Sequence, residues 1–237
     1  MSLYFEELDY RQTPIGELSL RKRRELRLDV DVYEIKLGEE FLMSSLFTAS
    51  ERALARLAMA ELGPGTHDVV VGGLGLGYTA QAALAHESVH SLLVVEALQP
   101  VIDWHEQGLL PIGRDLSRDN RCRFRKADFF ALAASREGFD DECSGRCFDA
   151  VLLDIDHSPD LWLDANNGAF YRHEGLQAMA RHLRPGGIFG LWSDAAPDTA
   201  FTERLEAVFE HARAEAVSFH NPLIDCEHTQ TVYLARA

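Results

Sequence analysis

The sequence has few cysteines and no long apolar run. Its 237 residues include four cysteines, which are too few for a scaffold built on disulfides in a chain of this length. No apolar run approaches the roughly 18 residues that a membrane-spanning helix needs. The first ten residues carry acids rather than the apolar core of a signal peptide. We therefore expect a cytoplasmic protein without a membrane segment.

Basic residues are also in the minority. The chain has 23 lysines and arginines against 38 aspartates and glutamates, a formal net charge of −15. Because such a protein repels phosphate backbones, we expect no nucleic-acid partner. The single basic run, Arg21–Arg24, is expected on a strand edge that its charges protect from aggregation. The charge suits a cationic or small-molecule substrate, although acidity can serve solubility alone.

Patterns of metal ligands are missing as well. Cys143 and Cys147 lie in a polar, acidic segment, and their spacing is not that of a zinc knuckle. A metal site would need two further ligands close by. We interpret these residues as two reduced thiols in a loop and expect no metal.

What the chain does contain is a regular alternation of strand and helix patterns. Hydrophobic residues make up 46% of it, as in a globular protein. Polar and apolar residues alternate over 17–21 and 29–37, which predicts a small antiparallel sheet. A helix is predicted over 47–62. Beyond residue 66 we predict strands over 68–72, 91–96, 122–126, 148–154, 187–192, 215–219 and 230–235, and helices over 79–86, 100–107, 129–136, 173–183 and 199–213.

This order predicts an α/β fold. Apolar strands alternating with helices form a parallel sheet covered on both faces, and the last two strands follow one another directly, as in an antiparallel hairpin. We expect a class I methyltransferase-type, doubly wound seven-stranded sheet with a small N-terminal antiparallel β-domain. The expected boundaries are 1–47 for the β-domain and 48–237 for the cofactor-binding domain.

A glycine-rich turn follows the first apolar strand of this region. The run Val69–Val71 stops in glycines that include Gly73, Gly75 and Gly77. Glycines let a ligand approach the backbone, and the helix that follows offers free N–H groups. The next strand ends in Glu96, whose carboxylate is placed to accept hydrogen bonds from ribose hydroxyls. The pattern predicts a nucleoside-bearing cofactor; a dinucleotide fingerprint that uses Ala80, or a turn without a ligand, stays open.

Two further acids fall at strand ends. Asp128 and Phe129 close the third predicted strand, where the acid can accept from an adenine amino group while the ring packs on the base. Asp128 would also cap a helix well. Asp154 ends the fourth predicted strand, at the sheet edge where open α/β sheets bind their ligands.

In their order and spacing these residues resemble the spermidine-synthase-like branch of class I S-adenosylmethionine-dependent transferases. The resemblance runs from about residue 15 to the end of the chain. It rests on these motifs: Gly72–Gly77, Val95–Glu96, Pro100–Ile102, Ala127–Asp128, Leu153–Asp154 through Ser158–Pro159, Phe170–Tyr171 and Leu183–Gly187. It implies S-adenosylmethionine or its decarboxylated form as donor, a small amine as acceptor, and a homodimer.

The chain departs from that family in its substrate half. Family members carry an aspartate in the glycine turn, which is absent here, and a Tyr-Gln pair where Met43 and Ser44 stand. The family's loop Asp-x-x-Asp has His157 in place of its second aspartate, with Asp156 one position early.

The candidate site residues follow from both arguments. Asp154 is expected to orient an attacking amine and take its proton, with His157 as the other candidate base and Asp156 in an acidic mouth. For the cofactor we expect Gly73, Gly75, Gly77, Glu96, Asp128, Phe129 and Asp154; for the substrate, Tyr78, Ser44 and Tyr171.

We expect a methyltransferase that acts on a small amine-bearing substrate. The alternative is a polyamine aminopropyltransferase that uses decarboxylated S-adenosylmethionine. A non-catalytic nucleoside-binding scaffold is a second alternative, and an NAD-dependent oxidoreductase is the least favoured. The exposed N-terminal strands suit pairing with a second copy of the chain.

Overall fold

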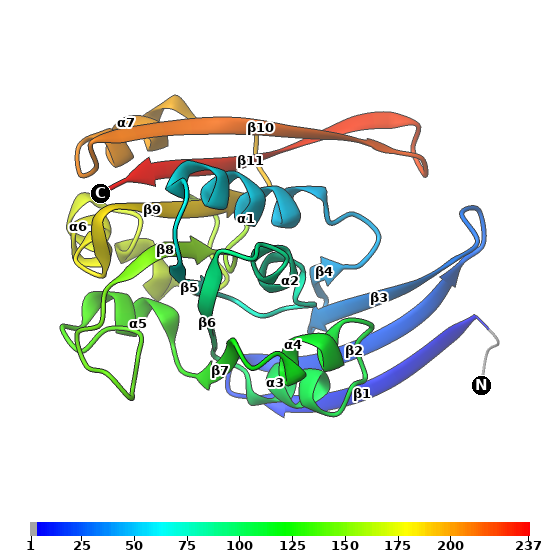
Figure 1. The fold of residues 1–237 in the computed structure, drawn as a ribbon. Coiled ribbons are helices and arrows are strands. Elements are labelled where there is room, and N and C mark those ends of the chain that lie inside the picture. The colour runs from blue at the N-terminus through cyan, green and yellow to red at the C-terminus, as the bar shows by residue number, and fades with distance from the viewer. Residues whose placement is uncertain (1–3) are drawn as a thin grey trace.

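The chain folds as two sheets with helices around the larger one (Figure 1). A computed structural model describes residues 4–237. The strands are β1 (Phe5–Thr13), β2 (Gly16–Glu25), β3 (Val30–Leu37), β4 (Glu40–Ser44), β5 (His67–Gly72), β6 (Val89–Glu96), β7 (Cys122–Lys126), β8 (Phe148–Leu153), β9 (Leu183–Ser193), β10 (His211–Asn221) and β11 (Cys226–Arg236). The helices are α1 (Ala49–Leu62), α2 (Tyr78–Leu84), α3 (Gln99–Glu106), α4 (Gly113–Arg118), α5 (Phe129–Ala134), α6 (His173–Ala180) and α7 (Thr199–Glu206), with a 3₁₀ turn η1 (Ala165–Ala169).

The larger sheet has seven strands in the order β10-β11-β9-β8-β5-β6-β7. Strands β7, β6, β5, β8 and β9 run parallel, and β11 and β10 complete the sheet antiparallel. The chain order reverses beside β5, because β6 lies on one side of it and β8 on the other. Ligands of open α/β sheets bind at such a reversal, beyond the carboxyl ends of the strands. The predicted fold class is confirmed, including the terminal hairpin.

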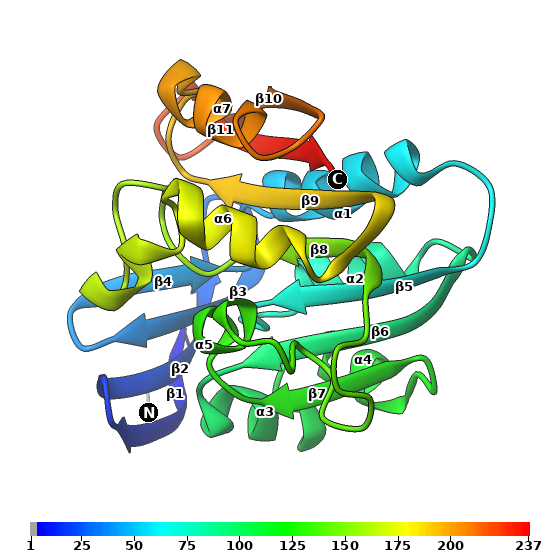
Figure 2. The ribbon, with the colours of Figure 1, turned by 90° about the vertical axis from the view of Figure 1, so that its left-hand side faces the viewer.

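Helices cover both faces of this sheet (Figure 2). One core includes residues of α1 to α4, and the other includes residues of α5 to α7. The central strands β5 and β8 supply fully buried side chains to both cores, such as Val69 and Val70. Burial on both faces explains why these strands read as continuous apolar runs in the sequence.

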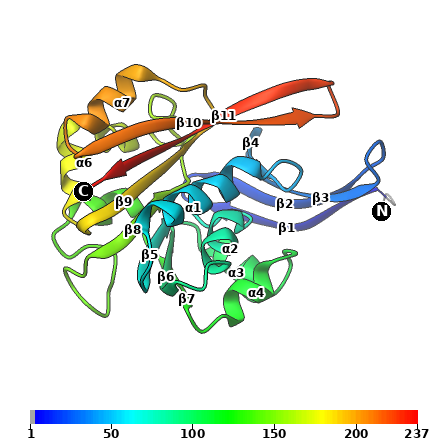
Figure 3. The ribbon, with the colours of Figure 1, turned by 45° about the horizontal axis from the view of Figure 1, so that its top comes forward.

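The smaller sheet, β1-β2-β3-β4, packs on the core that contains α1. Its buried Leu18, Leu20 and Ile35 belong to that core. The indole N–H of Trp104 in α3 donates to Asp9 in β1 over 2.7 Å. At the other end, the Arg27 guanidinium donates to the Leu223 carbonyl over 2.6 Å, so the β2–β3 turn meets the β10–β11 turn (Figure 3). The division at residue 47 stays a prediction.

The structure corrects three local expectations. β1 and β4 were not predicted: β1 is mostly polar and exposed, and β4 is a five-residue strand whose apolar residues Phe41–Met43 are consecutive, so neither shows an apolar alternation. The helix predicted to residue 213 ends at Glu206, and the alanine-rich segment from His211 forms β10 because it pairs along the whole of β11. The basic run lies in β2, inside the small sheet and not on its edge, and acids on β3 pair with it.

No helix in the described part of the chain is both long and apolar enough to cross a membrane.

Candidate active site

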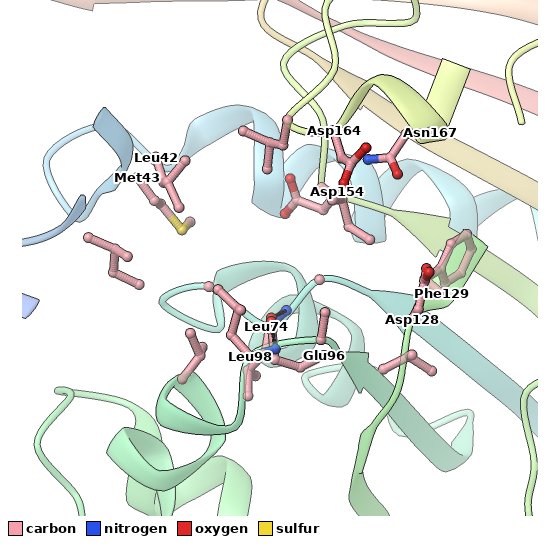
Figure 4. Close-up of a pocket in the computed structure, with 18 of the residues that line it drawn as sticks. Leu42, Met43, Leu74, Glu96, Leu98, Asp128, Phe129, Asp154, Asp164 and Asn167 are labelled. Atoms are coloured by element: carbon pink, nitrogen blue, oxygen red, sulfur yellow. Dashed lines mark hydrogen bonds between the residues drawn. The ribbon is translucent and has the colours of Figure 1, made fainter. Parts of the chain in front are cut away.

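A cavity of about 290 Å³ lies where the carboxyl ends of the parallel strands face the small sheet (Figure 4). Its lining comes from the β5–α2 turn, the ends of β6 and β8, the start of α5, the segment around η1 and strands of the small sheet. It includes these residues from the sequence prediction: Gly73, Gly75, Glu96, Asp128, Phe129, Asp154 and His157. The sheet edge therefore brings together most of the expected cofactor residues.

The glycine turn lies against the end of β8. Gly73 has φ of 92°, and a Cβ there would lie 2.1 Å from the carbonyl oxygen of Asp154, so only glycine allows this approach. Gly77 has φ of 91°, and a Cβ there would lie 2.6 Å from Leu116 and 2.8 Å from His105. Gly77 is outside the cavity lining and is the N-cap residue of α2. The turn thus places Gly73 and Gly75 at the cavity, beside Asp154.

Glu96 is held by backbone amides at the end of β6. Its Oε2 accepts from the Leu74 N–H over 3.0 Å and its Oε1 from the Leu98 N–H over 2.8 Å. Burial raises the pKa of this carboxyl, and the amide hydrogen bonds oppose the rise. A carboxylate has about four acceptor sites, so Glu96 can also accept from two ribose hydroxyls.

Asp128 caps α5 and also faces the cavity. Its Oδ1 accepts from the N–H groups of Phe130 and Ala131, over 2.9 and 3.3 Å. Both bonds use one oxygen, which leaves Oδ2 for a ligand. The ring of Phe129 is 2% exposed and fills the space where Gly72 has no Cβ. Phe129 therefore lines the cavity as a packed ring with little exposed surface.

Asp154 forms a pair with a carboxylate that the sequence reasoning missed, Glu51 of α1. Burial raises the pKa of Glu51 to about 7, with the nearby charge of Asp154 as the second cause. Burial also raises the pKa of Asp154. The hydroxyl of Thr79 lies 2.5 Å from Oδ2 of Asp154 and 3.3 Å from the carbonyl oxygen of Glu51. Near neutral pH the two carboxyl groups therefore compete for a proton.

Ser50 connects Glu51 to the aromatic side of the cavity. The indole N–H of Trp192 donates to the Ser50 hydroxyl over 2.8 Å, and that hydroxyl donates to Glu51 over 2.9 Å. Trp192 lines the cavity and was also missed. A signal for Glu51 exists in the sequence, since it shares one helical face with the apolar Leu54 and Ala58.

Asp156 is 2% exposed and lies outside the cavity lining. It accepts from the Leu163 N–H, the Asn167 amide and the Tyr171 hydroxyl, over 2.8, 3.0 and 2.7 Å. Tyr171 is 1% exposed and lies outside the lining too. These contacts fix the segment that carries the lining residues Leu163, Asp164 and Asn167. Any catalytic role of Asp156 stays a prediction.

The other predicted substrate residues do not line the cavity. Tyr78 is outside the lining, and the guanidinium carbon of Arg52 lies 4.9 Å from the centre of its ring. The Ser44 hydroxyl accepts from the Leu46 N–H over 3.2 Å. His157 does line the cavity, and its Nε2 lies 2.8 Å from a carboxylate oxygen of Glu40.

The cavity lining is strongly acidic. It contains five carboxylates, Glu51, Glu96, Asp128, Asp154 and Asp164, and the described lining holds no lysine or arginine. A ligand that carries positive charge is therefore favoured there.

Most backbone amides of the glycine turn are already engaged. The N–H of Gly73 donates to Val95, and that of Gly77 donates to Leu74. The N–H of Leu74 donates to Glu96 over 3.0 Å, and that of Leu76 donates to the Met43 sulfur over 3.2 Å. The turn thus offers a ligand carboxylate little hydrogen bonding.

Across residues 4–237, no group of three or more histidine, cysteine, aspartate or glutamate side chains is arranged to hold a metal ion. Cys143 and Cys147 are free cysteines.

No protein-family model matches the chain. Solved structures do match its fold. A spermidine synthase in complex with the transition-state analogue AdoDATO superposes with a TM-score of 0.74 at 17% sequence identity, over 97% of this chain and 73% of that one. A spermidine synthase from Thermotoga maritima gives a TM-score of 0.73 at 17% identity, over 97% and 72% of the two chains. The chain thus has the spermidine-synthase-like fold expected from its motifs.

Proposed function

We propose that the protein transfers an aminopropyl group from decarboxylated S-adenosylmethionine to a small amine. The observation that carries this proposal is the charge of the cavity, with its carboxylates and no cationic side chain among the described lining residues. The arm of this donor ends in an ammonium group and lacks a carboxylate. Its positive charge suits Glu51 and Asp154, while a carboxylate would meet repulsion and few free amides.

The nucleoside part of the donor fits the residues at the strand ends. Glu96 accepts from ribose hydroxyls, Asp128 accepts from the adenine amino group, and the glycine turn lets the sulfonium centre approach Asp154. The donor supplies a carbon made electrophilic by the attached sulfonium.

The chemistry left to the protein is to align the amine and to remove its proton. Asp154 accepts a hydrogen bond from the attacking amine and holds it in line with the carbon–sulfur bond. As the nitrogen–carbon bond forms, the carbon–sulfur bond breaks and its electron pair stays on sulfur as a neutral thioether. Asp154 takes the proton released by the amine, a role that its raised pKa favours.

Methyl transfer from S-adenosylmethionine, our first expectation from the sequence, is the second candidate. Its support is the glycine turn, where Gly75 stands in place of the aspartate of family aminopropyltransferases. The structural likeness to spermidine synthases, with the acidic cavity, favours aminopropyl transfer over it.

Calorimetric titration with three ligands tests the proposal: S-adenosylmethionine, its decarboxylated form, and 5′-methylthioadenosine. We expect the decarboxylated donor to bind about tenfold more tightly than S-adenosylmethionine, or more. Tighter binding of S-adenosylmethionine would instead support methyl transfer. If none of the three binds, both transferase proposals fail and the scaffold alternative gains support.

A further inference from the structure

The cavity changes character beyond Asp154, on the side away from Asp128 and Phe129 (Figure 4). Leu42 and Met43 lie on that side in the close-up. We define the apolar wall as the lining residues of the small sheet, of β9 and of the segment after β8 that carry no polar hydrogen-bonding group toward a ligand: Ile15, Ile35, Leu42, Met43, Ile155 and Trp192. The indole N–H of Trp192 is already used by Ser50.

On this side of the cavity, the carboxylates lie at the Asp154 end of the apolar wall. Glu51 and Asp154 lie close enough for the charge of one to raise the pKa of the other. Glu40 of the small sheet is outside the cavity lining, and one of its carboxylate oxygens lies 2.8 Å from Nε2 of His157. In Figure 4 Asp164 lies beside Asp154, and Asp128 lies on the side away from Leu42 and Met43. Among the labelled residues, the acids therefore lie at the Asp154 end of the apolar wall or beyond it.

An acceptor amine placed for reaction puts its nitrogen at Asp154, and its body extends along the apolar wall. A hydrocarbon body gains from leaving water there. A second ammonium group would lose part of its water there and gain no charged partner from the wall residues, which is unfavourable. The donor arm adds a further demand, since its own ammonium needs one of the two carboxylates.

We propose that the acceptor is a primary monoamine with an apolar body rather than a polyamine. This inference rests on the proposed function, because it takes Asp154 as the residue that meets the attacking nitrogen.

Two amines of equal size test this inference. n-Pentylamine and 1,4-diaminobutane have the same number of non-hydrogen atoms and differ only in a terminal methyl against a terminal ammonium. Each is titrated into the protein saturated with 5′-methylthioadenosine, and kcat/KM is measured with the decarboxylated donor. We expect pentylamine to be favoured about tenfold or more in both measurements.

The outcomes separate this inference from the proposed function. Equal or tighter binding of the diamine overturns the inference, as does the absence of binding by both amines while the nucleoside binds. Binding of pentylamine without any aminopropyl transfer contradicts the proposed function and leaves the apolar acceptor site supported.

A matched pair of variants places the acceptor on the apolar wall. Leu42 lies on the edge strand β4 and is partly exposed, so the small sheet tolerates polar residues there. Leu42→Glu should shift the preference toward 1,4-diaminobutane by about tenfold, because the new carboxylate pairs with the second ammonium. Leu42→Gln should weaken the binding of pentylamine without strengthening the binding of 1,4-diaminobutane. An unchanged preference in Leu42→Glu overturns the placement; if that variant does not fold, the wild-type comparison decides.

Discussion

Replacement of Glu51 by glutamine should stabilise the protein near pH 8 and leave it nearly unchanged near pH 5. Glu51 is 7% exposed, and burial raises its pKa from 4.5 to about 7. Between these values the folded protein binds more protons at this site than the unfolded chain does. The free energy of unfolding of the wild type therefore falls as the pH rises through this interval.

The size of the effect follows from the shift. An interval from 4.5 to about 7, at about 1.4 kcal/mol per pKa unit, corresponds to roughly 3 kcal/mol lost above pH 7. Glutamine has nearly the same shape and no charge to bury, so the variant avoids this loss. For a chain of this length the melting temperature near pH 8 should rise by roughly 5–10 °C. Near pH 5 the gain should stay below about 1 kcal/mol.

Thermal and urea unfolding across this pH range measure the effect. Glu106→Gln is the matched control, since Glu106 is an exposed acid at the end of α3, and it should change the free energy of unfolding by no more than about 0.5 kcal/mol. The reasoning is refuted if Glu51→Gln gains equally at both ends of the range, or if it loses stability near pH 8.

Three further substitutions address the site and the turn. Asp154→Asn should lower kcat for aminopropyl transfer by about 10²–10⁴-fold while the affinity for 5′-methylthioadenosine, measured by calorimetry, changes little; an equal loss in both would point to a binding role instead. Glu96→Gln should weaken the binding of 5′-methylthioadenosine by about 10–100-fold, because the amide nitrogen of the glutamine would face a backbone N–H such as that of Leu74. An unchanged affinity would exclude the proposed role of Glu96 in binding ribose. Gly77→Ala should cost about 2 kcal/mol more in urea unfolding than Gly186→Ala, since both have positive φ but a Cβ meets neighbours only at Gly77; equal costs would contradict this.

The sequence predicted the central strands β5 and β8 well because these strands are buried on both faces. β5 and β8 contain apolar runs, and such a run in the sequence indicates a strand that is buried on both faces. β10 lacks this signal: its residues alternate between partly buried and exposed, and its alanines favour helix in isolation. Only the pairing with β11 makes it a strand, and a local pattern does not contain that information.

Some residues of the candidate site could also be predicted from the sequence, and others could not. Glu96 and Asp154 could be predicted because they end buried strands, and strand ends share one edge of the sheet. Glu51 reaches the cavity from α1, so its partner Asp154 is distant in sequence and the pairing follows only from the packing of α1 on the sheet. For Asp156 the sequence predicted a residue of the site, but not the direction of its side chain. The chain has left β8 by then, so the alternation of a strand no longer determines where its side chain points.

Charge connects the donor and the acceptor in this cavity. We assign Glu51 and Asp154 to the donor arm and the attacking amine, and Asp164 lies beside Asp154 at the same end of the apolar wall (Figure 4). If the donor arm is cationic, one carboxylate meets that arm and the other meets the attacking amine, which leaves an apolar body as the favoured remainder of the acceptor. If the donor instead carries its own carboxylate, that group neutralises the ammonium of the arm, and the pair becomes free for an acceptor of higher charge. A measured preference for the decarboxylated donor should therefore accompany a preference for monoamines, and the two results together would exclude a polyamine acceptor more strongly than either alone.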